Sequence, residues 1–126
     1  MSDQPRARAD RPALAPVSQF EIDDEVARLK QESAWQSGTR NAITLVKHGP
    51  LRVVLIALRS GTHLEEHHAV GPLTLHVLSG VVRVHTIGRA MDLGRGMLLA
   101  LDASVRHDVE ALEESTLLLN LVQPSP

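Results

Sequence analysis

The pattern of hydrophobic and polar positions changes from a helical period to a strand period near Gly38. Before this residue, Ile22, Val26 and Leu29 recur at the spacing that places side chains on one face of a helix. Three acidic residues lie at the start of the segment, where the helix dipole favours carboxylates, and Gly38 is a natural stop. The pattern therefore predicts one short amphipathic helix over residues 20–36, packed on the outside of the domain.

After Gly38 the chain divides into short segments rich in Val, Ile and Leu, which are separated by Gly, Pro, Asp and Ser. The segments predicted as strands are 42–47, 51–59, 73–78, 81–86, 90–93, 97–101, 106–111 and 115–122. Short strands at nearly even spacing indicate an all-β sandwich or barrel. The glycines at 94 and 96 connect two strands rather than a strand and a helix, so they do not form a phosphate-binding loop.

Two of the predicted strands are apolar on both faces, namely LRVVLIAL at 51–58 and STLLLNLV at 115–122. A strand of a small barrel normally faces the core on one side and water on the other, so here the outer face is expected to be covered as well. The helix can cover one patch and a second copy of the chain another, which predicts a homodimer. Asn120 is polar within such a strand and needs a partner if it is buried, so it is a candidate pocket residue.

Composition excludes several classes of function. The chain has 126 residues, enough for one domain, and we expect a disordered arm over 1–18 followed by one domain over 19–126. The net charge of -2 and an aromatic content of 2% argue against nucleic-acid and membrane partners. The absence of cysteine excludes disulfides and a cysteine nucleophile and fits a cytoplasmic protein.

A histidine-rich segment, GTHLEEHHAVGPLTLHVLSG, lies between Gly61 and Gly80, and the isolated His107 follows on a later predicted strand. Histidine is a frequent metal ligand, and a small β-barrel can build a metal site from a histidine-rich loop and a distant histidine. This segment is the part of the sequence that points most directly to a specific chemistry.

The glycines and histidines of this region resemble the motifs of the cupin superfamily, in particular the small single-domain cupins. The first motif, G-x5-H-x-H-x3-E-x6-G, aligns without gaps on Gly61, His67, Ala69, Leu73 and Gly80. Both glycines and the first histidine match, whereas the second histidine and the glutamate are replaced.

The second cupin motif, G-x5-P-x-G-x2-H, aligns on Gly96, Asp102, Ser104 and His107, of which the opening glycine and the histidine match. The resemblance covers roughly residues 42–122. It implies a jelly-roll barrel, also called a double-stranded β-helix, with a short N-terminal helix as an extension.

The resemblance also implies a metal site, because cupins with complete motifs hold one divalent metal through three histidines and a glutamate. A first-row metal usually takes at least three protein ligands, so His67 and His107 are too few by themselves. Alternate residues of an extended chain share a face, and His63 can therefore join them, with Glu65 or water completing the set. The prediction is one divalent ion, Zn, Ni, Fe or Mn, on His63, His67 and His107, with a metal-free pocket as the alternative.

Two functions remain open at this stage, and so does the question of enzymatic activity. In the first, a metal acts as Lewis acid or oxygen site in dioxygenase-like or isomerase-like chemistry. In the second, a non-enzymatic binding or sensor module holds a small, mostly apolar ligand, and His67 and His107 orient its polar end. The remaining candidates are predicted to be surface or outer-face groups: His48, Glu65, Glu66, His68, His76, Arg83 and His85.

Overall fold

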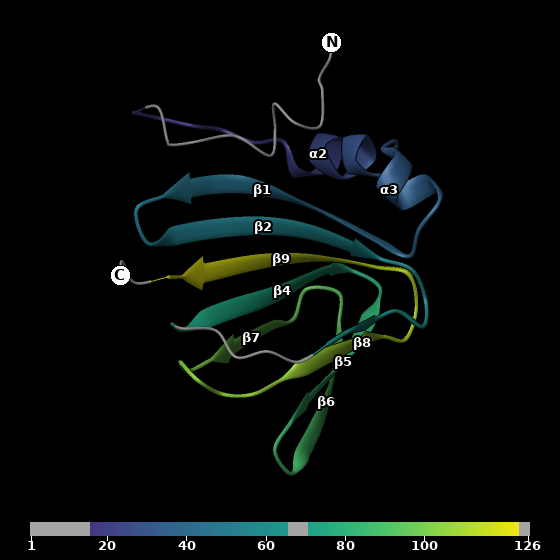
Figure 1. Cartoon of the computed structure of the whole chain (residues 1–126), viewed down its shortest axis with the longest axis vertical. Coiled ribbons are helices and arrows are strands. Elements are labelled where there is room, and N and C mark those ends of the chain that lie inside the picture. Colours follow the sequence, from purple (N-terminus) through teal and green to yellow (C-terminus); the bar gives the residue numbers. More distant parts are fainter. Residues whose placement is uncertain (1–15, 66–70, 124–126) are drawn as a thin grey trace.

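The computed structural model describes residues 16–65 and 71–123, which form two short helices and two antiparallel β-sheets (Figure 1). The helices are α2 (Ile22–Leu29) and α3 (Ser33–Gln36). The strands are β1 (Arg40–His48), β2 (Leu51–Leu58), β3 (His63–Leu64), β4 (Leu73–Ser79), β5 (Val81–Thr86), β6 (Arg89–Gly94), β7 (Leu98–Leu101), β8 (Asp108–Ala111) and β9 (Ser115–Val122). None of the helices in these two ranges is long and apolar enough to cross a membrane.

The single helix predicted over 20–36 is divided in two, which corrects that prediction. Leu29 and Trp35 are both buried in the same apolar cluster against the sheet. In one continuous helix these residues would stand about 120° apart around the axis, since each residue turns the helix by about 100°. A turn at residues 30–32 lets both side chains reach the sheet. The second helix, α3, begins directly after this turn.

The strands order as β1-β2-β9-β4-β7 in one sheet and as β3-β8-β5-β6 in the other. Every strand predicted from the sequence is present, with ends that differ by a few residues, and the all-β architecture is confirmed. The short β3 is an additional strand, which pairs with β8 through His63 and Leu64. In Figure 1 the sheets curve around a common interior, and the helices lie beside β1 and β2.

One apolar core fills the space between the two sheets. Alternate residues of β4 point into it, and their partners come from β5, β8 and β9. Its most deeply buried members are Leu58, Val77, Val82, Val84 and Leu117, each 0% exposed. This alternation of buried and half-buried positions is the pattern expected of strands in a two-sheet barrel.

A second apolar core lies on the outer face of the five-stranded sheet, under the helices. It contains Leu29 and Trp35 from the helices with Ile43, Leu55 and Ala57 from β1 and β2. The amide Nδ2 of Asn41 donates to the carbonyl of Leu29 at 3.0 Å, which ties the sheet to the end of α2. The helices thus cover the second apolar face of β2.

Candidate functional site

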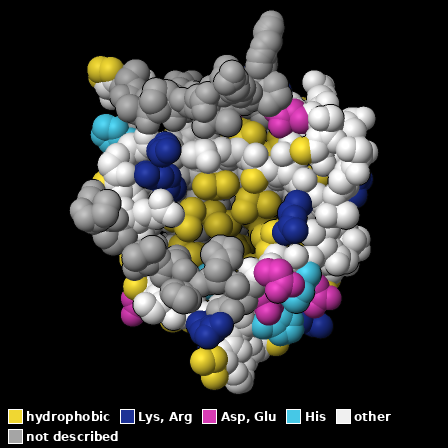
Figure 2. Space-filling view, viewed as in Figure 1, with side chains coloured by type: hydrophobic (Ala, Val, Ile, Leu, Met, Phe, Trp, Pro, Cys, Tyr) yellow, Lys and Arg dark blue, Asp and Glu magenta, His cyan; other side chains and the backbone are white. Residues whose placement is uncertain are grey.

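A cavity of about 340 Å³ opens between the two sheets at one end of the barrel. Figure 2 shows this face of the molecule, where hydrophobic side chains gather in a central hollow and basic side chains lie on either side of it. The residues that line the cavity are Arg40, Ile56, Leu64, Glu65, Leu73, Leu75, His107, Asp108, Val109, Leu117 and Leu119. The wall is mostly aliphatic, and the volume falls in the lower part of the range of small-molecule sites.

The register of the strands explains why these side chains meet in the cavity. Leu73 and Leu75 of β4 stand opposite Leu121 and Leu119 of β9, so they share the inner face of the five-stranded sheet. Leu64 and Val109 are cross-strand partners in the other sheet and form the facing wall. The cavity is therefore an extension of the inner core that is left open at the barrel end.

His107 lies immediately before β8 and is half-buried at the cavity. Its Nδ1 lies 3.0 Å from the carbonyl oxygen of Val105. A carbonyl can only accept, so Nδ1 carries the proton in this contact. In the neutral ring, Nε2 is then the nitrogen that can accept a hydrogen bond or ligate an ion. The backbone of the preceding turn thus fixes the chemical role of this imidazole.

That turn also shows why the cupin motif has a glycine at the position of Ser104. Ser104 has a φ of 70°, the one positive φ of a non-glycine residue among those that the structure describes. Asp102, at the position of the motif proline, accepts from the backbone N–H of Ala103 through Oδ1 at 3.0 Å. The local geometry therefore follows the second motif although two of its residues are changed.

The other candidates predicted from the sequence are not gathered beside His107 in the described part of the chain. His67, together with His68 and Glu66, lies outside the described residues. His63 is not among the residues that line the cavity, and its Nε2 lies 3.4 Å from Oδ1 of Asp108, which does line it. The ligand set of His63, His67 and His107 accordingly stays a prediction.

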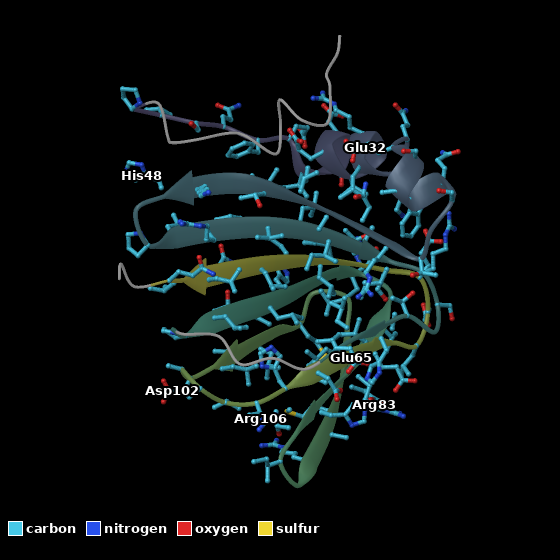
Figure 3. The ribbon with its side chains drawn as sticks, in the orientation of Figure 1. Glu32, His48, Glu65, Arg83, Asp102 and Arg106 are labelled. Carbon is cyan, nitrogen blue, oxygen red and sulfur yellow. The ribbon has the colours of Figure 1, made fainter. Side chains whose placement is uncertain are left out.

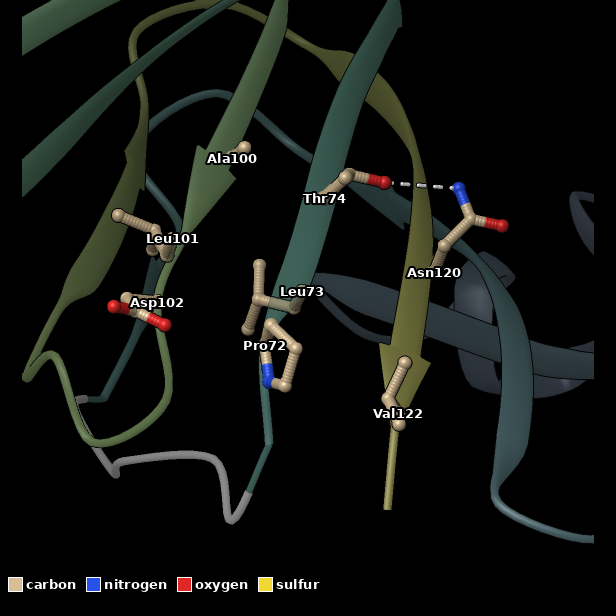
Figure 4. A pocket seen from close by; sticks show the side chains of 8 residues that line it. All are labelled: Pro72, Leu73, Thr74, Ala100, Leu101, Asp102, Asn120 and Val122. Carbon is tan, nitrogen blue, oxygen red and sulfur yellow. Dashed lines mark hydrogen bonds between the residues drawn. The ribbon is translucent and has the colours of Figure 1, made fainter. Parts of the chain in front are cut away.

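Asn120 lies on the face of β9 opposite to the cavity, since Leu119 and Leu121 pack inward. Its Nδ2 donates to Oγ1 of Thr74 at 3.1 Å, as Figure 4 shows. Both residues line a second, more open hollow of about 410 Å³ on the outer face of β4, β7 and β9, with Pro72, Leu73, Ala100, Leu101, Asp102 and Val122. Asn120 therefore lines a surface hollow, where its side-chain amide is hydrogen-bonded to Thr74.

The donors seen in the cavity do not by themselves fit a metal ion. Leu73 stands where cupins place the glutamate ligand, and it is 6% exposed with its hydrocarbon in the cavity wall. Within residues 16–65 and 71–123 no three His, Asp or Glu side chains are close enough to hold an ion. Among the described residues, His107 is the imidazole that lines this cavity.

Arg40 is the cavity residue that sequence reasoning missed. It is the first residue of β1 and pairs with Leu58, whose side chain points into the inner core. Its position could have been inferred only from the register between β1 and β2, because the sequence pattern of β1 does not show which face is the inner one.

Arg83 and Asp92 form an ion pair between β5 and β6, and neither residue lines the cavity. Arg83 is labelled in Figure 3. The guanidinium donates through Nε at 2.7 Å to one carboxylate oxygen and through Nη2 at 3.0 Å to the other. These hydrogen bonds, together with the opposite charge, lower the pKa of Asp92 and raise that of Arg83. Arg83 is thus an outer-face residue, as predicted, and its partner is on the neighbouring strand.

Comparison with solved structures shows what this arrangement is similar to. A conserved protein of unknown function from Streptococcus pyogenes has a TM-score of 0.70 at 20% identity, covering 93% of this chain and 99% of that one. A cupin superfamily protein from Desulfitobacterium hafniense has a TM-score of 0.65 at 15% identity, covering 67% and 77%. A salicylate 1,2-dioxygenase from Pseudaminobacter salicylatoxidans has a TM-score of 0.77 at 17% identity, covering 92% of this chain but only 38% of the dioxygenase.

No protein-family model and no curated protein matches the sequence. The structural likenesses confirm the fold inferred from the two motifs, a jelly-roll barrel of the cupin type. At this level of sequence identity they show the fold alone, because one barrel fold serves many functions.

Proposed function

We propose that this small cupin-fold domain binds a small, largely apolar molecule in its barrel cavity, and that His107 orients the polar end of that molecule. The observation that supports this is the aliphatic wall formed by Ile56, Leu75 and Leu119, beside which His107 is the imidazole contributed by the described residues. Release of water from such a wall favours an apolar ligand, and one placed polar group fixes its orientation.

The test is an NMR titration of 15N-labelled protein with 1-octanol, beside a variant in which the cavity is filled. Leu119→Trp places a large side chain in the cavity, whereas Ile87→Trp changes a residue that is 88% exposed at the β5–β6 turn and does not line the cavity. We expect the amide signals of Leu75, Val109 and Leu119 to shift in the wild type and in Ile87→Trp but not in Leu119→Trp. Equal shifts in Leu119→Trp, or none in the wild type, would contradict the proposal.

A second candidate is a divalent metal bound with the help of His107. The supporting observation is the hydrogen bond from Nδ1 of His107 to the Val105 carbonyl, because metal-ligating histidines usually donate their second ring nitrogen in this way. A bound ion would supply a Lewis acid or an oxygen site. The remaining ligands would come from His67, which is outside the described residues, and from His63.

Elemental analysis tests whether the protein binds a divalent metal. We expect a nearly stoichiometric metal in the wild type that falls in both His67→Ala and His107→Ala, while His48→Ala, in the exposed β1–β2 turn, keeps it. No metal in the wild type after incubation with excess nickel, zinc, iron and manganese rejects the metal site. That result would leave the proposal of an apolar ligand standing, because the titration with 1-octanol tests that proposal separately.

We further propose that a second copy of the chain covers the outer hollow on β4, β7 and β9. The helices leave this part of the sheet open. Val122, which lines the hollow, is 42% exposed, and Leu98, on the same strand β7 as the lining residue Ala100, is 62% exposed. Light scattering should give a dimer for the wild type and a monomer for Leu98→Asp. The matched change Ile87→Asp, at the β5–β6 turn and 88% exposed, should stay dimeric, and a monomeric wild type would reject the proposal.

A further inference from the structure

The lining of the cavity includes charged residues of both signs, and they come from different sheets. Arg40 belongs to β1 of the five-stranded sheet. Glu65 follows β3, and Asp108 begins β8, so both acidic side chains come from the other sheet. The rest of the lining is mostly aliphatic.

Among the residues that the structure describes, Arg40 has no partner for its charge. Within residues 16–65 and 71–123, no carboxylate oxygen lies within 4.0 Å of its guanidinium nitrogens, and no hydrogen bond of this side chain is seen. The other arginine on the inner face of the same sheet, Arg52, is engaged: its Nη1 donates to the carbonyls of Gly49 and Leu51 at 2.7 and 2.9 Å. The unpaired fork of Arg40 is suited to a carboxylate, which it can bind through two parallel hydrogen bonds.

We propose that the cavity selects an amphipathic carboxylate, whose anionic end is bound by Arg40 and whose hydrocarbon lies along Leu73, Leu117 and Leu119. This inference rests on the proposed function, because it names the chemical class of the molecule that the same cavity binds. Arg40 is then the residue that selects an anionic ligand over a neutral one.

The experiment compares sodium octanoate with 1-octanol, two probes that have the same chain length and differ in charge. Dissociation constants are measured by NMR titration for the wild type, Arg40→Gln, Arg40→Lys and the control Arg52→Gln. We expect octanoate to bind at least about tenfold more tightly than octanol in the wild type, the gain that a single charge-assisted contact provides. Arg40→Gln should remove this preference without weakening octanol, Arg40→Lys should keep part of it, and Arg52→Gln should keep all of it.

The possible outcomes distinguish a failure of the role of Arg40 from a failure of the proposed function. Equal affinities for octanoate and octanol in the wild type, or a preference that survives in Arg40→Gln, overturn the role of Arg40 and leave the apolar site standing. Loss of both probes in Arg40→Gln, with an unchanged melting temperature, likewise overturns selection by charge. Failure of both probes to bind the wild type overturns the proposed function and this inference together.

Discussion

Gly80 lies directly against Ser115, so closely that a Cβ added at Gly80 would overlap the Ser115 side chain and the Glu114 carbonyl. The hydroxyl of Ser115 in turn lies 2.8 Å from the carbonyl of Glu113, and the backbone N–H of Leu112 donates to Val81 at 2.9 Å. The β4–β5 turn is thereby packed against the connection from β8 to β9. The last glycine of the first cupin motif is thus required by a close approach as well as by its φ of 84°.

Replacing Gly80 by alanine is expected to destabilise the domain strongly. A left-handed backbone costs an alanine about 1 kcal/mol, and the overlap with Ser115 adds about 2 kcal/mol of overpacking. Gly88→Ala is the matched control, because Gly88 has a φ of 69° but nothing within 4 Å of the added Cβ. Urea unfolding should give a loss of about 3 kcal/mol for Gly80→Ala and about 1 kcal/mol for Gly88→Ala. Equal losses would show that the contact with Ser115 has no energetic consequence.

The turn before His107 should be sensitive to β-branched residues at one position only. Ser104 has a φ of 70°, so Ser104→Val is expected to lose about 2 kcal/mol, whereas Ser104→Gly keeps or slightly raises the stability. Ala103→Val, one residue earlier and without a positive φ, should change the free energy of unfolding by less than about 0.5 kcal/mol. Thermal unfolding monitored by circular dichroism measures all three. Similar losses for the two valine variants would mean that the left-handed backbone is not the cause.

Arg59 fixes the position of Trp35, and lysine should not replace it. Its Nε donates to the Gly38 carbonyl at 3.1 Å, its Nη2 donates to the Trp35 carbonyl at 3.0 Å, and the guanidinium carbon is 4.1 Å from the centre of the indole ring. Because a lysine ammonium lacks the planar fork, Arg59→Lys should cost about 1–2 kcal/mol. Trp35 is the only tryptophan of the chain, so its fluorescence during urea unfolding reports this site.

The control for this measurement is Arg89→Lys at the exposed start of β6, which should leave the unfolding midpoint unchanged. If Arg59→Lys unfolds at the same midpoint as Arg89→Lys, the contacts between the guanidinium and Trp35 contribute no stability.

The strands could be predicted from the sequence because each carries its own apolar run and turn residues, whereas features fixed by tertiary contacts could not. The strand β3 is only two residues long, too short for any alternation to be recognised. Residues 30–32 contain neither glycine nor proline, and the helix is divided there because Leu29 and Trp35 must both be buried. In β1 a bulge between Thr44 and Val46 buries Leu45 and Val46 together, which strict alternation does not allow.

The candidate site was harder to predict than the strands for a related reason. Strand β9 is apolar on both faces, so the sequence does not show which face is the interior, and Asn120 lies on the outer one. The position of Arg40 depends on its pairing with Leu58, a contact between different strands. His107 was found because its spacing from Gly96 follows a motif, and the structure places it at the cavity.

The ion pair of Arg83 and Asp92 gives the domain a defined response to acid. The hydrogen bonds from Arg83 lower the pKa of Asp92 below its ordinary value of 3.8. The folded state therefore holds the carboxylate more strongly than the unfolded chain does. The resulting stabilisation is complete above the unfolded pKa and is lost as the pH falls below it through the folded pKa.

Arg83→Gln should raise the pKa of Asp92 toward its ordinary value, and a 13C NMR titration of the Asp92 carboxyl group between pH 2 and pH 6, a range of about two units on either side of that value, measures it. The fold should remain intact, since both side chains are exposed. Arg95→Gln, in the exposed β6–β7 turn, is the control and should leave the titration of Asp92 unchanged. An unaltered Asp92 pKa in Arg83→Gln would mean that the two hydrogen bonds do not persist in solution.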